Sequence, residues 1–261
     1  MRALPLIVAL LLLPLAARSQ GTVSNLGAEF GGRFSAAADW KLAPGLHAVF
    51  EGELRSRDNF AGLGRAQFGA GLEYKFSKAL KASAGYVFME NTNNGSVWKP
   101  RHRAYADLTG TLKSGQWRFS LKERLQMTCK PGANPYQTTP YALALKSRLK
   151  ASYKGFGAVS PYAAAELRVA LNDPACSATW NGGAYSGYTF KGYTDTYADR
   201  LRGTLGAEWK LDRSNELDFY LLGDFNYNKA IDTDRAGTTL KSLTWEKSFL
   251  LSIGVGYKFS F

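Results

Sequence analysis

The residues most able to do chemistry in this chain are its basic side chains, which recur at every second position of long alternating segments. The 261 residues include 33 Lys or Arg and 21 Asp or Glu, which gives a formal net charge of +12. Alternate residues of a β-strand share one face, so each run would present its cations to one side. Cations that line a narrow water-filled space attract anions. The densest runs predict a basic wall that consists of Arg118, Lys122, Arg124, Lys146, Arg148, Lys150, Arg200 and Arg202.

Catalytic and metal chemistry has little support in the sequence. The chain has two histidines, His47 and His102, in separate segments, and neither stands in a set with a serine or an acid as barrel hydrolases require. We interpret His47 as a polar interior side chain and His102 as a residue near a loop on the opposite face. No metal-ligand spacing occurs, and the GAGLEY segment that begins at Gly69 is not followed by a helix, as a phosphate-binding loop would be. We therefore predict a protein that is not an enzyme and uses no cofactor or metal.

The two cysteines, Cys129 and Cys176, suit a disulfide if the protein resides in an oxidising compartment. Both fall in segments that we expect to be loops on the same side of the molecule, which favours pairing. The alternative is a pair of free loop thiols.

The elements that position these side chains are strands, and the clearest is the last one, Ser248 to Phe261. Its aromatic and aliphatic residues alternate with small or polar ones, so it has one continuous apolar face. It has membrane-spanning length and ends on an aromatic residue, which is typical of outer-membrane β-barrels. Its polar face carries mainly Ser, Gly and the single cation Lys258. We expect this bare face to leave room for a solute across from the basic wall.

The same alternation recurs along the chain and predicts an antiparallel transmembrane β-barrel. Short turns alternate with longer loops, the longest from Asn172 to Tyr193, and aromatic residues gather near both strand ends. A soluble β-sandwich or lipocalin-like barrel is the alternative, but the apolar strands are too long and too numerous for it. Eleven strands are expected, at 27–42, 46–57, 65–76, 80–88, 101–112, 117–127, 141–153, 159–171, 194–210, 216–228 and 248–261.

The strand number raises a parity problem, because bacterial single-chain barrels normally have an even count. A hairpin at Gly31-Gly32 would give twelve strands but breaks the alternation, and a first segment outside the sheet would give ten. We therefore expect ten to twelve strands. Glu123 falls on the lipid-facing phase of its strand, where a carboxylate is costly, so we expect a bulge there or a position near the rim.

The segment from Met1 to Ser19 has the features of a secretory signal peptide, with Arg2 before an apolar core and a small-x-small cleavage site at its end. The expected organisation is a signal peptide at 1–19 and a single barrel domain at 20–261. Removal of Arg2 and Arg18 would lower the net charge from +12 to +10. A secreted destination argues against nucleic acid as the partner of this basic chain and leaves lipid headgroups or anionic solutes.

Several stretches resemble an uncharacterised outer-membrane barrel family of Gram-negative bacteria, known as a domain of unknown function of the 2490 type. These stretches are EGELRSRDNF from Glu51, GLEYKFSKALKASAGY from Gly71, RHRAYADL from Arg101, RFSLKERLQ from Arg118, PYAAAELR from Pro161 and the terminal GVGYKFSF. The resemblance implies a bacterial outer-membrane location and no established activity. The expected partners are outer-membrane lipid and the barrel-assembly machinery, which would bind the C-terminal strand ending in Phe261.

The expected function is a small porin-like channel or binding barrel for small anionic solutes, with the basic wall in its lumen. Arg and Glu side chains also often fill a narrow barrel as a salt-bridged core. The rival hypothesis is therefore a closed structural or interaction barrel that acts through its extracellular loops. A lipid-modifying barrel enzyme is a third and less favoured class.

Overall fold

The computed structural model describes residues 22–92 and 97–261, and this part of the chain consists of β-strands, turns and loops. The predicted signal peptide lies outside the described residues. None of the described residues form a helix that is long and apolar enough to cross a membrane. The strands are β1 (Thr22–Ala43), β2 (Leu46–Arg57), β3 (Gly62–Lys75), β4 (Leu80–Asn91), β5 (Lys99–Ser114), β6 (Trp117–Cys129), β7 (Tyr141–Tyr153), β8 (Val159–Asp173), β9 (Cys176–Trp180), β10 (Tyr185–Phe190), β11 (Asp195–Lys210), β12 (Asn215–Thr233) and β13 (Leu240–Ser260).

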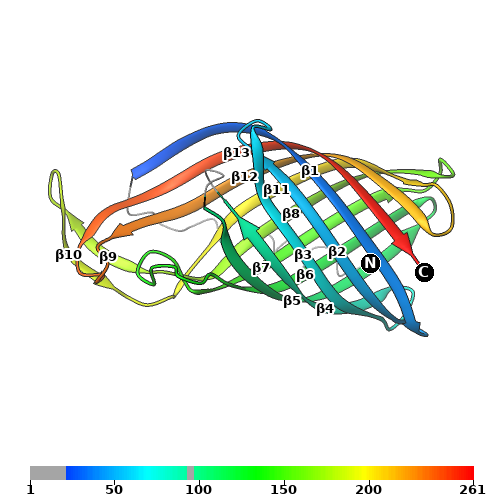
Figure 1. Cartoon of the computed structure of the whole chain (residues 1–261), viewed down its shortest axis with the longest axis horizontal. Helices are drawn as coiled ribbons and strands as arrows, with labels where there is room; N and C mark the ends of the chain where they lie inside the picture. Colours follow the sequence, from blue (N-terminus) through cyan, green and yellow to red (C-terminus); the bar gives the residue numbers. More distant parts are fainter. Residues whose placement is uncertain (1–21, 93–96) are drawn as a thin grey trace.

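Eleven of these strands form a closed barrel in the order β1-β13-β12-β11-β8-β7-β6-β5-β4-β3-β2 (Figure 1). Neighbours pair antiparallel except β1 and β13, which pair in parallel from Thr22↔Thr244 to Asp39↔Ser260. The parallel pair follows from the odd count, because the first and last strands of an up-and-down chain then run in the same direction. The expected range of ten to twelve strands is confirmed. Neither way of restoring an even count is correct, because Gly31 and Gly32 continue inside β1 and β1 belongs to the barrel.

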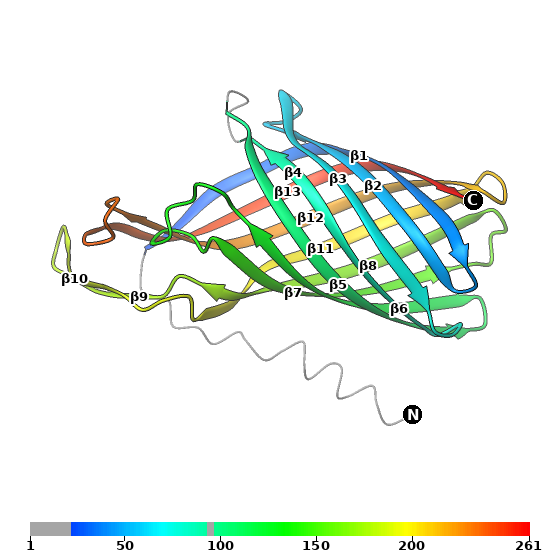
Figure 2. The same ribbon diagram turned by 60° about the horizontal axis from the view of Figure 1, so that its bottom comes forward.

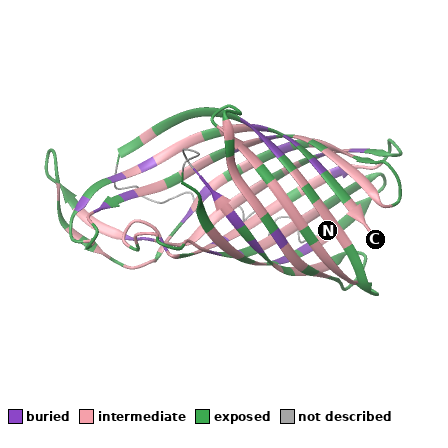
Figure 3. Ribbon diagram, viewed as in Figure 1, coloured by how far each residue is buried: buried purple, intermediate pink, exposed green. Residues whose placement is uncertain are grey.

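The alternating sequence decides which side of each strand faces outward. Large apolar side chains of one phase are exposed on the outside, as Phe34 (58%), Phe68 (60%) and Leu205 (62%) show. Exposed and less exposed residues accordingly alternate in bands across the sheet (Figure 3). The polar phase points to the interior, where Arg33, Asp107 and Asp224 are buried. This division is the one that the alternation predicts.

The two ends of the barrel differ in their connections. At the end with short turns, which we call the turn end, the strands are joined by residues 44–45, 76–79, 115–116, 154–158 and 211–214. The opposite end, which we call the loop end, carries the longer connections. The predicted loop from Asn172 to Tyr193 contains a separate two-stranded sheet of β9 and β10. This hairpin and the ends of β12 and β13 project beyond the barrel (Figures 1 and 2), so the hairpin does not fold into the lumen.

The projecting hairpin has a small apolar core of its own. Ile231, Leu240 and Leu243 of β12 and β13 are buried, and Cys176, Ala178, Tyr185 and Tyr188 of the hairpin pack against them. The strands β12 and β13 are therefore longer than the sequence predicted, because pairing continues up to Thr233↔Leu240.

Gly32 has a packing role where β1 leaves β2 at the loop end. A Cβ atom at Gly32 would lie 2.5 Å from the Phe60 ring, so a side chain there would collide with it. The Gly32 amide donates a hydrogen bond to Ser56 Oγ (2.6 Å), and the Phe30 amide donates one to Asn59 Oδ1 (2.8 Å). The glycine pair thus lets the connection after β2 close against β1 and does not form a turn.

Candidate functional site

In the described part of the barrel, two of the lumen cavities have linings in which cations far outnumber acids. The loop-side cavity, about 430 Å3, is lined by Gly32, Arg33, Arg55, Ser56, Arg57, Gly64, Arg65, Asn91, Thr92, Arg101, Arg103, Lys146, Arg168, Arg200, Arg202, Asp224, Asn226, Asn228, Leu250 and Ser252. The turn-side cavity, about 620 Å3, is lined by Lys81, Thr109, Thr111, Arg118, Ser120, Lys122, Arg148, Lys150, Ser152, Lys154, Gly157, Ser160, Glu208, Lys210, Glu216 and Lys258. Ten cations and one acid thus line the first cavity, and eight cations and two acids line the second.

The structure divides the predicted basic wall between these two cavities. Lys146, Arg200 and Arg202 line the loop-side cavity. Four other members line the turn-side cavity, namely Arg118, Lys122, Arg148 and Lys150. Arg124 lies between the two groups along β6 and is held by Asp107 of β5. The wall is therefore two clusters at different heights, and its functional role stays a prediction.

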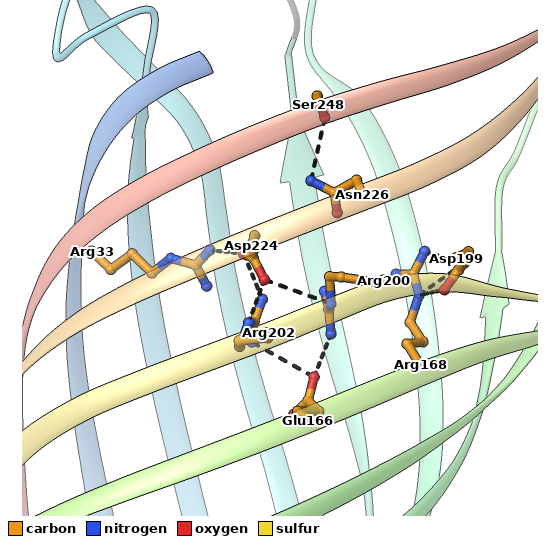
Figure 4. A network of polar contacts seen from close by, with 9 residues as sticks. All are labelled: Arg33, Glu166, Arg168, Asp199, Arg200, Arg202, Asp224, Asn226 and Ser248. Carbon is orange, nitrogen blue, oxygen red and sulfur yellow. Dashed lines mark hydrogen bonds and ion pairs between the residues drawn. The ribbon is translucent and has the colours of Figure 1, made fainter. Parts of the chain in front are cut away.

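A network of ion pairs joins four strands on one side of the lumen (Figure 4). Asp224 of β12 accepts hydrogen bonds from Arg33 Nη2 and Arg202 Nε, each at 2.6 Å. Glu166 of β8 accepts a hydrogen bond from Arg200 Nη2 (2.5 Å). The Arg33 and Asp224 side chains are only 4% and 5% exposed. Because Arg33 reaches Asp224 across β13, the network ties the closing strands together as well as neutralising part of the charge.

Asp199 is a lumen acid that the regular alternation did not reveal. A register shift between Ala198 and Arg200 interrupts the β8–β11 pairing, which turns Asp199 inward although Arg200 also points inward. Arg168 binds Asp199 with Nε and Nη2, at 2.5–2.9 Å. Because a bulge leaves no clear signal in a single sequence, the alternation does not predict that Asp199 faces the lumen.

Other members of the basic wall have carboxylate partners on other strands of the barrel. Asp107 of β5 binds Arg124 Nε (2.7 Å) and Lys122 Nζ (3.1 Å), and its side chain is 2% exposed. Glu208 of β11 pairs with Lys150 and with Lys154. No carboxylate of the described chain lies within ion-pair distance of Arg118, Lys146 or Arg148. The wall is thus partly neutralised, and its unpaired members are found in both cavities.

Three inward tyrosines lie at a height between the two cavities, and we call Tyr105, Tyr162 and Tyr220 the tyrosine layer. Along their strands each lies between residues that line the loop-side cavity and residues near the turn end. Arg124 lies over the Tyr105 ring (4.0 Å to the centroid), and Lys150 over the Tyr162 ring (3.7 Å). No motif in the sequence marks these residues, although they share the polar phase of their strands.

The closing strand does not provide the open space that its small residues suggest. A Cβ atom at Gly254 would lie 2.0 Å from the Tyr220 ring, which shows that the tyrosine fills the space beside this glycine. Ser252 is 1% exposed, and Lys258 Nζ pairs with Asp39 (3.3 Å). The expectation of room for solute beside β13 is wrong at the height of Gly254, because a neighbouring side chain occupies it.

Glu123 is neither at a bulge nor near the rim. It lies in the middle of β6, and both neighbouring pairings run through it without a register shift, as Leu108↔Glu123 and Glu123↔Ser147. Its outward carboxylate accepts a hydrogen bond from Ser147 Oγ (2.6 Å). The structure accommodates the acid through this cross-strand serine.

The histidines and cysteines lie apart from one another. His47 contacts Asp39 (2.6 Å) and Lys75 (3.0 Å) near the turn end, whereas His102 contacts the Tyr86 hydroxyl (2.5 Å) near the loop end. Cys129 and Cys176 are free thiols, so the predicted disulfide is not formed in this structure. Burial raises the pKa of the Cys176 thiol, which lies in the projecting hairpin. No group of three or more His, Cys, Asp or Glu side chains in the described residues could hold a metal ion.

The fold and its lumen define a closed β-barrel with a polar, predominantly basic interior. A family model described as "Protein of unknown function (DUF2490)" matches residues 34–235, and the chain belongs to this family. No curated protein matches the chain.

Two solved structures have a similar chain trace. One is the outer-membrane expressed OmpT of Vibrio cholerae, with a TM-score of 0.35 and 11% identity over 78% of this chain and 61% of that chain. The other is an anion-selective porin from Comamonas acidovorans, with a TM-score of 0.34 and 14% identity over 82% of this chain and 55% of that chain. The chain thus spans less than two thirds of the length of either structure.

Proposed function

We propose that this protein is an outer-membrane barrel whose basic lumen takes up small anionic solutes, without catalysing a reaction. The exposed apolar belt supports the membrane location, because a closed barrel with an apolar outer face and a polar interior suits a bilayer. The proposed partners are outer-membrane lipid around this belt and the barrel-assembly machinery at the C-terminal strand β13. Phe261 at its end is tied to β1 by a hydrogen bond from its amide to the Asp39 carbonyl (2.9 Å).

The observation that carries the proposal is the excess of cations in both cavities. The two cavities together are lined by eighteen cations and three acids. Ten of the cations and one of the acids line the loop-side cavity, and the others line the turn-side cavity. Three basic-wall members lack a carboxylate partner within the described chain. A fixed excess of positive charge in a narrow lumen favours anions over cations.

Ion selectivity of the full chain in a planar lipid bilayer tests this proposal. Under a potassium chloride gradient we expect the reversal potential of an anion-selective conductance. The double variant Arg118→Glu with Arg148→Glu should lower the anion-to-cation permeability ratio several-fold, because neither arginine has an ion pair to lose. The matched control is Arg235→Glu with Lys241→Glu, two exposed cations of the loop end outside both cavities. A cation preference of the unchanged protein contradicts the proposal.

A closed barrel that acts through its loop end is the second candidate. The tyrosine layer favours it, since these rings and the ion pairs beside them lie between the two cavities. This candidate predicts no conductance in the same bilayer and no effect of the Arg118 and Arg148 variants on ion flux. The measured current therefore separates the two functions.

A further inference from the structure

The charge of the loop-side cavity is far from balanced, even when every carboxylate that forms an ion pair with its lining is counted. Five carboxylates, Asp224, Glu166, Asp199, Glu53 and Asp58, form ion pairs with six of its ten cations. Ten positive charges less five negative charges leave an excess of +5. Such an excess within one cavity of about 430 Å3 opposes folding by self-repulsion unless counter-ions occupy it.

Four of the ten cations have no carboxylate partner in the described chain. They are Arg65, Arg101, Arg103 and Lys146. Arg65 Nε donates to the Asn91 side-chain oxygen, and Arg103 Nε donates to Thr128 Oγ1 (3.1 Å). These neutral partners fix the guanidinium groups without cancelling their charge. All four stand on β3, β5 and β7, so one arc of the barrel is positive and uncompensated.

Two arginines of the opposite arc also have hydrogen-bond donors without an acceptor. Arg33 and Arg200 belong to the ion-pair network on β1 and β11, but their Nε atoms are buried and lack a hydrogen-bond partner. A buried donor without a partner costs free energy that a ligand oxygen would recover. The arginines that carry these donors line the same cavity as the four unpaired cations.

We propose that the loop-side cavity binds a solute that carries two or more phosphate groups. The inference rests on the proposed function, because the solute must enter the same lumen. A phosphate monoester carries about −1.5 to −2 at neutral pH, so two or three of them match an excess of +5. Arginine, the residue type of nine of the ten cations, binds phosphate oxygens in a bidentate manner. The cavity volume lies within the range of roughly 300–1,000 Å3 that small-molecule sites occupy.

The site is tested by calorimetric titration of pyrophosphate into the full chain, reconstituted in lipid vesicles. At equal ionic strength we expect pyrophosphate to bind at least about tenfold more tightly than orthophosphate, because it engages both arcs. Arg103→Gln combined with Lys146→Gln should weaken pyrophosphate binding about a hundredfold, since two charge-assisted contacts are lost. These changes break no ion pair and relieve repulsion, so the variant is expected to fold.

The matched control is Arg235→Gln with Lys241→Gln, which removes one arginine and one lysine from the exposed loop end. Its pyrophosphate affinity should stay within about twofold of the unchanged protein, because these charges are screened from the cavity by solvent. Equal affinities of the two double variants, or no preference for pyrophosphate over orthophosphate, would overturn the inference.

The bilayer measurement separates a failure of this inference from a failure of the proposed function. An anion-selective conductance without tight pyrophosphate binding leaves the function standing and removes the site. Pyrophosphate binding that is lost in the Arg103 and Lys146 variant supports the site even if no current is observed. In that case the channel function fails and the protein is a binding barrel.

Discussion

Glu123 is the side chain whose position conflicts most with its surroundings, since its carboxylate lies on the apolar outer face in the middle of β6. Leu121 and Leu125 flank it on the strand, and Leu108 pairs with it across β5. Its one hydrogen bond in the described chain comes from Ser147 (2.6 Å). In a bilayer such a carboxylate is costly, and the serine reduces the cost by supplying a donor.

Replacing Glu123 should therefore stabilise the barrel in lipid. We expect Glu123→Leu to raise the free energy of unfolding by about 1–2 kcal/mol, because an apolar side chain replaces an acid on the lipid-facing surface. Ser147→Ala is the complementary change and should lower it by about 1 kcal/mol, because the carboxylate loses its donor. Urea titration in lipid vesicles measures both. A Glu123→Leu barrel that is less stable than the unchanged one would show that this face is not in contact with lipid.

At the scale of elements, the barrel is closed by an unusual pair of strands. β1 and β13 run in parallel, and their register places Ala36 beside Tyr257 on the outer face. The ion pair of Arg33 with Asp224 of β12 crosses β13 inside this seam, and Trp40 contacts Phe261 (5.9 Å between ring centroids) at its turn end. The seam is thus secured by side chains as well as by backbone hydrogen bonds.

Thiol cross-linking checks the parallel register. In a background with Cys129→Ser and Cys176→Ser, we expect Ala36→Cys with Tyr257→Cys to cross-link rapidly with a short bifunctional reagent. Ala36→Cys with Ile253→Cys is the control, because Ile253 pairs with Gly32, four residues or about 13 Å along the strand. Faster cross-linking in the control would mean that the strands pair in another register.

At the scale of the whole molecule, the tyrosine layer lies at a height between the two cavities. Each ring lies against a glycine of a neighbouring strand, so the layer is packed into the wall of the barrel. A Cβ atom would lie 2.6 Å from Tyr105 if placed at Gly85, 2.7 Å from Tyr162 at Gly206 and 2.0 Å from Tyr220 at Gly254. These close contacts restrict the movement of the rings, and the layer is the expected constriction of the lumen.

Removing the layer should therefore increase conductance. We expect the triple variant Tyr105→Ala, Tyr162→Ala and Tyr220→Ala to raise single-channel conductance several-fold, because three large side chains leave the narrowest level of the lumen. The outward tyrosines Tyr86, Tyr141 and Tyr257 provide a control with the same number of Tyr→Ala changes. Unchanged conductance in the inner triple variant would place the constriction elsewhere.

The sequence alone determined the barrel class, the face of each strand and the basic character of the lumen. These properties depend on a period of two residues, which is a local property of the chain. Alternation identified Arg148 and Arg202 as interior cations, and the end of the expected final strand agrees closely with β13.

Only the tertiary structure decided which charges are paired and where space remains. Asp107 neutralises Arg124 from another strand, a bulge turns Asp199 inward, and the Tyr220 ring fills the space beside Gly254. The parallel seam and the projecting β9–β10 hairpin likewise depend on how distant segments meet. A two-residue period fixes the direction of a side chain but not its neighbour across the lumen, because that neighbour is set by strand register and barrel closure.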